Sequence, residues 1–179
     1  MKKLLVIING TGASGKDTFV KHISNEFGGV TNVSSVDKIY NVAKELGWDG
    51  NKNAKFRKMM HLIKRASVEY NDGPTKYCIE KVKEFLNSED KIIFVHIREP
   101  EEIAKFEKEA EKVVDADTAI ISLLVQIPGN KNYWNNASDN GVNGYNYDYI
   151  FDNRMSRDKG RSHAISFFKT YLLQYIKEW

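Results

Sequence analysis

The chain is poor in cysteine, in long apolar runs and in net charge, and each shortage excludes a class of protein. Cys78 is the single cysteine, so the chain has no internal disulfide and no CxxC metal site, and Cys78 is expected to be an ordinary helix residue. No apolar run approaches the roughly 18 residues of a membrane span. The 27 basic and 24 acidic residues nearly balance, at a net charge of +3, so neither a nucleic acid nor a membrane is expected as a partner.

The amino-terminal start, Met1-Lys2-Lys3 followed by apolar residues, superficially resembles a signal peptide. The apolar run ends after Ile8, where a glycine-rich segment begins, so we expect a strand there and not a secretion signal. A length of 179 residues suits one α/β domain with a sizeable core. We therefore predict a single domain over residues 1–179, cytoplasmic, and a monomer or a homodimer.

Strand and helix patterns alternate along the chain, which predicts a parallel sheet covered by helices on both faces, a three-layer α/β fold. The predicted strands are Leu4–Ile8, Val30–Val36, Lys91–Ile97, Ala119–Ile127 and Tyr147–Phe151. The predicted helices are Lys16–Phe27, Lys38–Leu46, Ala54–Tyr70, Thr75–Asn87, Glu101–Glu111 and Arg161–Glu178.

Two connections are longer than such a sheet requires. Residues 38–88 hold three helices where one would suffice, and residues 128–146 form a polar, Asn/Gly-rich stretch. Loops of this length are uncommon unless they have a function or are mobile. The first is predicted to be a helical insert that binds an acceptor. The second is either a lid that closes over bound phosphates or an ordinary disordered loop.

The most specific motif follows the first strand directly and predicts nucleotide binding. Its sequence, G-T-G-A-S-G-K at residues 10–16, matches the G-x-x-x-x-G-K phosphate-binding loop, or P-loop. The glycines let backbone N–H groups surround phosphate oxygens, and the following helix directs its positive end at them. The residues predicted to bind ATP are Gly10, Thr11, Gly12, Ala13, Ser14, Gly15, Lys16, Asp17 and Thr18.

One P-loop position is unusual. The residue after the lysine is ordinarily Ser or Thr, whose hydroxyl binds Mg²⁺, whereas this chain has Asp17 there and Thr18 one place later. A carboxylate can hold Mg²⁺ directly or through water, so Asp17 is a candidate metal ligand. In the other interpretation, Asp17 only favours the first turn of the helix. In the first case Thr18 is available for the α-phosphate.

Two classes of P-loop protein lack their motifs in this sequence. A GTPase should carry Asn-Lys-x-Asp after a strand, and a motor-type ATPase should carry an apolar strand that ends in Asp-Glu; neither pattern is present. The size of the chain and its helical insert favour a phosphotransferase that acts on small molecules.

Further motifs resemble one branch of the nucleoside-monophosphate-kinase-like family, the branch with G-K-D in the P-loop. It includes phage-type deoxynucleoside monophosphate kinases and animal-type phosphomevalonate kinases. The segments that carry the resemblance, in order, are Gly15-Lys16-Asp17, Lys55–Met60 (KFRKMM), Ile97–Ile103 (IREPEEI), Ser138-Asp139-Asn140 and Tyr147–Asn153 (YDYIFDN). The chain departs from this branch at His96, where an Asp is usual, and in the residue 128–146 stretch, which has no arginine.

The resemblance and the chemistry of phosphoryl transfer together assign roles. Lys16 and Mg²⁺ would neutralise the donor phosphates. Arg57, Lys58, Lys64 and Arg65 could form a cationic face of one helix. Of these, Arg57, Lys58 and Arg65 would bind the phosphate of the acceptor, because arginine forms bidentate phosphate contacts. Alternatively these three side chains belong to a solvated helix face. Asn153 follows the last strand, where the resemblance places adenine recognition.

Two more residues lie at the predicted carboxyl edge of the sheet, where ligands bind in such folds. Asp37 either orients an acceptor hydroxyl or a Mg²⁺-bound water, or caps the helix that follows. Arg98 either binds the acceptor or pairs with Asp37. His96 is interpreted as a buried histidine with its hydrogen bonds satisfied. Aromatic residues such as Tyr40 and Trp48 either stack on a base or pack within the protein.

The sequence thus predicts an ATP-dependent phosphotransferase whose partners are ATP with Mg²⁺ and a small phosphorylated acceptor, first of all a (deoxy)nucleoside monophosphate. Phosphomevalonate and dephospho-coenzyme A are the alternative acceptors. A protein that binds ATP as a sensor, without transferring phosphate, is the alternative of another class.

Overall fold

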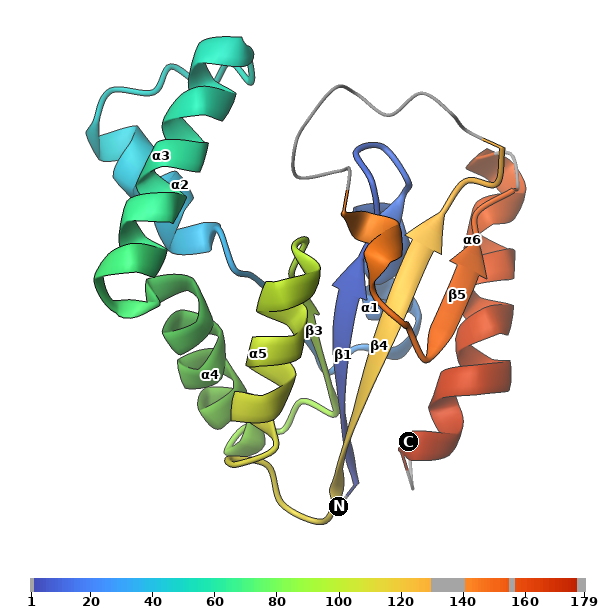
Figure 1. Cartoon of the computed structure of the whole chain (residues 1–179). Helices are drawn as coiled ribbons and strands as arrows, with labels where there is room; N and C mark the ends of the chain where they lie inside the picture. Colours follow the sequence, from blue (N-terminus) through green and yellow to red (C-terminus); the bar gives the residue numbers. More distant parts are fainter. Residues whose placement is uncertain (1, 130–140, 155–156, 177–179) are drawn as a thin grey trace.

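A five-stranded parallel sheet forms the centre of the molecule. The computed structural model describes residues 2–129, 141–154 and 157–176. The strands are β1 (Lys3–Asn9), β2 (Val30–Ser34), β3 (Ile92–His96), β4 (Thr118–Gln126) and β5 (Tyr149–Asp152), in the order β2-β3-β1-β4-β5. Every pairing is parallel, so all five carboxyl ends meet at one edge (Figure 1). The predicted sheet is confirmed.

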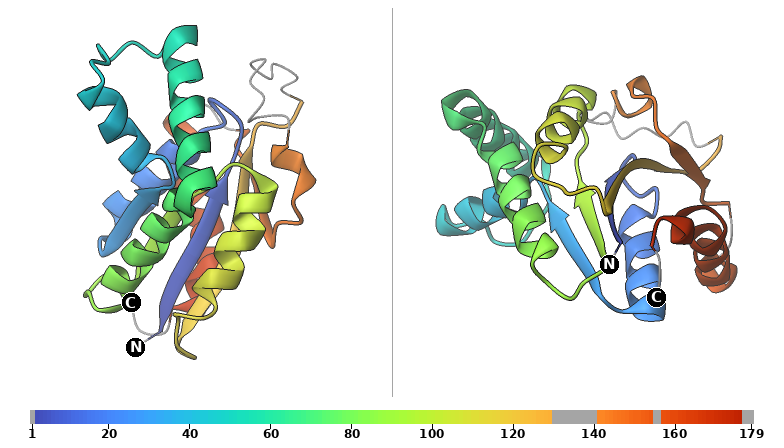
Figure 2. Two further views of the ribbon diagram at one scale, coloured as in Figure 1. Left: turned by 60° about the vertical axis from the view of Figure 1, so that its left-hand side comes forward. Right: turned by 90° about the horizontal axis from the view of Figure 1, so that it is seen from below.

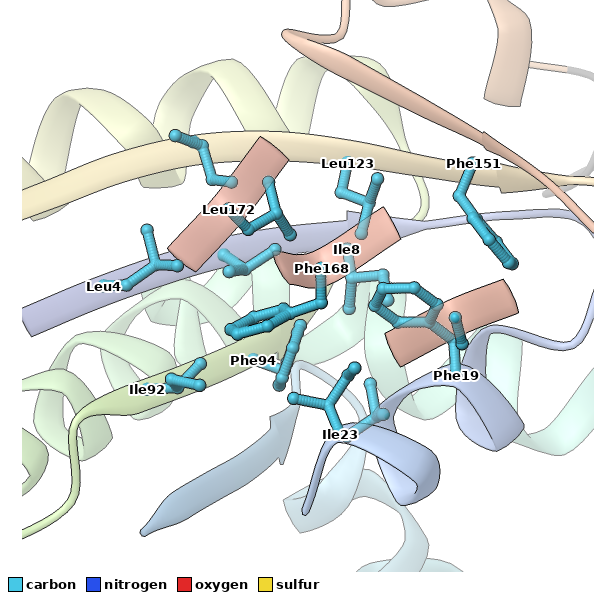
Figure 3. Packing of buried hydrophobic residues seen from close by; sticks show 14 of the residues in the cluster. Leu4, Ile8, Phe19, Ile23, Ile92, Phe94, Leu123, Phe151, Phe168 and Leu172 are labelled. Carbon is cyan, nitrogen blue, oxygen red and sulfur yellow. The ribbon is translucent and has the colours of Figure 1, made fainter. Parts of the chain in front are cut away.

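Helices cover both faces, as predicted. Side chains of the central strand β1 alternate: Leu4, Val6 and Ile8 face α1 (Lys16–Phe27) and α6 (Arg157–Phe167). Leu5 and Ile7 face α4 (Gly73–Leu86) and α5 (Pro100–Ala110) on the other side. Figure 2 shows the sheet between these two layers of helices, and Figure 3 shows the packing on the α1 side. Both faces of β1 are buried, which agrees with its apolar residues from Leu4 to Ile8.

Of the three helices in residues 38–88, α4 packs on the sheet, whereas α2 (Asp37–Glu45) and α3 (Ala54–Asn71) precede it, and α3 extends past the carboxyl ends of the strands (Figure 1). Below, the insert means α2 and α3. Asn53 caps α3, since its side chain accepts the N–H of Phe56 at 2.9 Å. Trp48 stacks on Phe56 with ring centroids 4.1 Å apart, and Tyr40 packs against both rings. These aromatic side chains therefore form the small core of the insert.

The last helix differs from the prediction of one helix over Arg161–Glu178. It begins at Arg157, and its hydrogen bonding changes to a π-helical turn over Phe168–Leu172 and a 3-10 turn over Leu173–Tyr175. The buried residues that it contributes to the core are spaced four apart: Ala164, Phe168, Leu172 and Ile176. In a regular α-helix that spacing drifts around the axis. The wider π turn compensates for the drift and keeps the four side chains on the sheet.

The predicted lid, residues 128–146, lies largely outside the described residues. Its described end includes a 3-10 turn, Val142–Gly144, in which Val142 is buried. A Cβ on Gly141 would lie 3.3 Å from Pro100 Cδ, so this turn packs closely on the start of α5. Within the described part of the chain, no helix is both long and apolar enough to cross a bilayer.

Cys78 lies on α4 and is buried, as an ordinary core residue would be. Burial raises the pKa of its thiol to about 12, so the thiol stays protonated at physiological pH. This agrees with the expectation that Cys78 is a helix residue without special chemistry.

The π turn gives a first testable prediction. Phe168 is fully buried and packs on Phe27 with ring centroids 4.9 Å apart. Truncation to alanine leaves a cavity in the α1-side core, so Phe168→Ala should lower the free energy of unfolding by about 3–5 kcal/mol. Denaturant titration followed by circular dichroism measures this change. Thr170→Ala, an exposed position in the same turn, is the control and should change it little; equal effects would contradict the packing described here.

Candidate active site

The connection between β1 and α1 has the conformation that a phosphate-binding loop needs. Ala13 and Gly15 both have positive φ angles, 61° and 92°, which turn successive N–H groups toward one side. A Cβ at position 15 would collide with Asn153 Nδ2, and a Cβ at position 10 would collide with the carbonyl of Val125. Glycine is therefore required at both positions on grounds of space, and at position 15 also on grounds of conformation.

One buried polar atom in this loop lacks a partner. Among the described residues, no group hydrogen-bonds to the hydroxyl of Ser14, although Ser14 is 2% exposed. A buried hydroxyl without a partner is costly, and a phosphate oxygen would supply one. The orphaned hydroxyl, the two tight glycines and the start of α1 all fit a nucleotide phosphate.

The ionisable residues at the mouth of the loop come from two elements. Lys16 and Asp17 begin α1, with Lys16 Nζ 3.9 Å from Asp17 Oδ1. His96 is the last residue of β3, and its Nδ1 lies 3.6 Å from the same carboxylate oxygen. Burial lowers the pKa of His96 to about 4, since the nearby charge of Asp17 offsets this effect only in part. The imidazole is therefore neutral at pH 7.

The other ring nitrogen of His96, Nε2, lies 2.8 Å from Asn32 Oδ1 on β2. With the Asn32 amide in this orientation, Nε2 donates to Oδ1 and Nδ1 presents a lone pair toward Asp17. The expectation of a buried histidine with satisfied hydrogen bonds is thus met on one side of the ring only. The sequence analysis did not connect His96 with Asp17.

Asn9, at the end of β1, ties the loop to its surroundings. Its Oδ1 accepts the N–H of Gly10 at 2.7 Å, and its Nδ2 donates to the carbonyl of Arg98 at 2.8 Å and to Tyr147 Oη at 2.7 Å. Tyr147 donates in turn to the carbonyl of Val142 at 2.8 Å. This fully buried amide therefore joins the P-loop, the β3–α5 connection and the turn at 142–144.

Asn153 follows β5 and closes the opposite side of the loop. Its Nδ2 donates to the carbonyl of Ser14 at 2.9 Å, and its backbone N–H donates to Gln126 O at 2.7 Å. The side chain of Asn153 thus supports the backbone of the P-loop directly. Its predicted part in adenine recognition stays a prediction.

The structure places Asp37 and Arg98 at the predicted edge of the sheet. Asp37 is the first residue of α2, and its Oδ2 accepts the N–H of Ser34 at 2.8 Å, which closes the turn between strand and helix. Its charge also raises the pKa of Tyr77 on α4, after the larger effect of burial. Arg98 holds Asn9 through its backbone carbonyl. The catalytic roles of both side chains stay predictions.

The three predicted acceptor ligands on α3 differ in their surroundings. Arg57 and Lys58 lie in the exposed first turns, beyond the edge of the sheet. Arg65, by contrast, donates to Glu69 at 2.7 Å and is 68% exposed. It thus forms a pair along the helix surface, which fits the alternative of a solvated face, and its role as an acceptor ligand stays a prediction.

Lys64 holds the insert against the start of α5. Its Nζ lies 2.5 Å from Glu99 Oε2 and 2.7 Å from Glu102 Oε2, and all three side chains are largely buried. Burial raises the pKa of Glu102 to about 7, and the charge of Glu99 adds to this. For Glu99 burial acts in the same direction, but the charge and hydrogen bond of Lys64 outweigh it and leave the pKa below its ordinary value. Lys64 is therefore a structural anchor of the insert, and the expectation that it belongs to an open cationic face is wrong, because two glutamates enclose it.

The described residues limit how a metal ion could be held. Nowhere among them do three or more His, Cys, Asp or Glu side chains converge on one point. This fits Mg²⁺, which binds through one or two protein groups together with substrate phosphates and water. Asp17 is the carboxylate beside the phosphate-binding loop, so the residues present are compatible with a nucleotide-bound divalent ion.

A cavity of about 260 Å³ lies elsewhere, between α2, the end of α3 and α4. Lys38, Tyr77 and Glu80 contribute to its lining, and it includes none of the predicted site residues.

The partners missed by the sequence analysis are Asn9, Asn32, Tyr147 and the two glutamates that bind Lys64. Only Asn9 carried a local signal, as a polar residue between a buried strand and the first glycine.

The contact of Asn153 with the P-loop gives a prediction for nucleotide binding. Asn153→Ala removes one hydrogen bond that supports the Ser14 carbonyl, so the Kd for ATP should rise about 2- to 10-fold. Isothermal titration calorimetry measures this change. The control is Asn87→Ala, which removes a similar amide bond, to the Lys83 carbonyl, at the end of α4. An unchanged Kd in Asn153→Ala would show that the loop keeps its shape without this support.

The Lys64 anchor gives a prediction for stability. Folding raises the pKa of Glu102 to about 7, so between about pH 5 and 7 the folded state holds a proton that the unfolded state releases. This contribution to stability is present at low pH and is lost as the pH rises through 7. Glu102→Gln abolishes the titration.

We therefore expect the melting temperature of Glu102→Gln, relative to that of the wild type, to increase from pH 5 to pH 7.5. Thermal unfolding across this range measures the difference, in which the contributions of groups outside the Lys64, Glu99 and Glu102 cluster cancel. Glu101→Gln is the control, because Glu101 is exposed on the same turn. A difference that is constant with pH would show that Glu102 ionises normally in the folded protein.

Comparisons with known proteins bear on the fold alone. The sequence matches no protein-family model and no curated protein. Among solved structures, a fungal RNA kinase is similar at a TM-score of 0.52 and 12% identity, over 100% of this chain and 90% of that one. A sugar kinase from Janibacter sp. is similar at a TM-score of 0.51 and 12% identity, over 99% of this chain and 100% of that one. A Thermus thermophilus protein is similar at a TM-score of 0.51 and 14% identity, over 96% of this chain and 99% of that one. The chain thus has the three-layer α/β fold of P-loop kinases.

Proposed function

We propose that this protein is an ATP-dependent phosphotransferase whose acceptor is a small phosphate monoester, in the first place a (deoxy)nucleoside monophosphate. The observation that carries this proposal is the phosphate-binding loop at the edge of the sheet from which α3 extends. Within the described ranges, the Ser14 hydroxyl of this loop has no hydrogen-bond partner. The proposed donor site and the exposed first turns of α3 thus lie at the same edge of the sheet.

The donor half of the proposal rests on the geometry of the loop. The positive φ angles of Ala13 and Gly15 orient backbone N–H groups, and Lys16 adds a full charge beside them. Phosphoryl transfer requires mainly positioning and the neutralisation of charge on the phosphates, which these groups supply together with a divalent ion.

The acceptor half rests on α3. Lys64 fixes the middle of this helix to α5, which starts directly after the β3 edge of the site. Arg57 lies seven residues before Lys64, two helical turns away on nearly the same face. Its guanidinium is therefore well placed to bind an acceptor phosphate in a bidentate manner, with Lys58 beside it.

The choice of acceptor rests on the resemblance to the G-K-D branch. By their names, the similar kinase structures act on different acceptors, RNA and sugar, so the fold does not select one. Phosphomevalonate and dephospho-coenzyme A are therefore included in the test as acceptors of the same class.

The test is the release of ADP from ATP and Mg²⁺ by the purified protein, with a panel of acceptors: the ribo- and deoxyribonucleoside monophosphates, phosphomevalonate and dephospho-coenzyme A. Release that depends on one acceptor identifies the substrate. ATP binding without stimulation by any acceptor would instead favour a nucleotide sensor, for which the absence of arginine in residues 128–146 is the specific argument.

Two substitutions separate the donor site from the acceptor site. Lys16→Ala should remove most of the activity. Arg57→Ala should raise the apparent KM for the acceptor about 10-fold or more, as expected for the loss of one charged hydrogen-bonding group, while ATP affinity stays nearly unchanged. Lys55→Ala, in the first turn of the same helix, is the control. An equal loss of ATP affinity in Arg57→Ala would contradict the assigned role.

A further inference from the structure

We propose that Asp17 and His96 together bind the divalent cation that accompanies the nucleotide, and that the imidazole makes this site favour Mn²⁺ over Mg²⁺. The inference rests on the proposed nucleotide binding and names a property of that site that the P-loop motif does not contain. It concerns two residues that are 79 positions apart in the sequence.

The distance between the two groups suits a shared ion. Asp17 Oδ1 and His96 Nδ1 are 3.6 Å apart. Neighbouring ligands of an octahedral ion bound at about 2.1 Å lie about 3 Å apart, so a small rotation of the Asp17 side chain would bring both groups to one ion. The carboxylate of Asp17 is 82% exposed, so it is accessible from the open site.

The orientation of the imidazole is that of a metal ligand. Metal-binding histidines commonly donate their second ring N–H to an oxygen of the protein, which fixes the ring and directs the free nitrogen. Asn32 Oδ1 has this position, 2.8 Å from His96 Nε2. The lone pair of Nδ1 then faces a carboxylate oxygen, which also only accepts. A cation between these two acceptors would bind to both of them, with Lys16 Nζ at 3.9 Å from the same carboxylate oxygen.

The chemistry of the two ligands distinguishes between ions. Mg²⁺ prefers oxygen ligands and keeps several bound waters. Mn²⁺ can replace Mg²⁺ at phosphate sites, and it also binds imidazole nitrogen. Because no third protein ligand of these types converges there among the described residues, the remaining positions belong to phosphate oxygens and water. The ion is therefore expected to bind with the nucleotide and only weakly without it.

The experiment is pulsed electron paramagnetic resonance of Mn²⁺ with the full chain and a non-hydrolysable ATP analogue, on protein labelled with ¹⁵N-histidine. Nitrogen coordinated to Mn²⁺ produces a hyperfine coupling that changes with the isotope. We expect this coupling in the wild type and its loss in His96→Gln. His22→Gln is the control, because His22 lies on α1, outside the site, and it should retain the coupling.

Binding gives a second readout that does not depend on turnover. In competition titrations with the same analogue, His96→Gln should lower the preference for Mn²⁺ over Mg²⁺ about 10-fold, a size that even changes beside a metal ligand commonly reach in metal affinity. Asp17→Asn should weaken the binding of both ions. A wild-type complex that binds Mn²⁺ and analogue without a histidine coupling would overturn the inference and leave the proposed nucleotide site intact. A protein that binds no analogue with either ion would overturn both.

Discussion

The side chain of Asn9 is the constraint on which the arrangement of the site depends. It is fully buried at the end of the central strand, and its amide contacts three connections that are distant in sequence. A buried amide that satisfies its donors and its acceptor has a single favourable orientation, because any rotation leaves polar groups unpaired. The start of the P-loop, the segment after β3 and the turn at 142–144 therefore keep a fixed relative position.

Lys64 on the insert is likewise held in place by buried polar contacts. Lys64 is enclosed between Glu99 and Glu102, so its charge stabilises the position of α3 and attracts no ligand. The two carboxylates share one lysine in a poorly solvated place, which is why Glu102 retains its proton more readily than an exposed glutamate. The first turns of α3, with Arg57 and Lys58, are exposed, and these are the cations of the helix that the proposed function assigns to the acceptor.

The sequence was sufficient for the order and type of the elements, because a buried parallel strand and an amphipathic helix each leave a pattern within a short window. It was not sufficient for the last helix, where an apolar spacing of four residues, from Ala164 to Ile176, resembles an ordinary helix and produces a π turn. The P-loop was recognisable since its chemistry lies in consecutive residues. The pairs Asn9–Tyr147, His96–Asn32 and Lys64–Glu102 were not, since each depends on how separate elements pack.

The contact between Asp17 and His96 is another one that the sequence did not reveal, and it changes how both residues are interpreted. In the sequence they are two unrelated departures, a carboxylate where a hydroxyl is usual and an imidazole where a carboxylate is usual. In the structure they are neighbours at 3.6 Å, so they are better explained as one feature than as two. With one carboxylate and one neutral imidazole, the pair offers an ion a single negative charge and one nitrogen. Such a ligand set suits an ion that tolerates mixed ligands, which is why ion selectivity, more than phosphate binding, should distinguish this site from an ordinary P-loop.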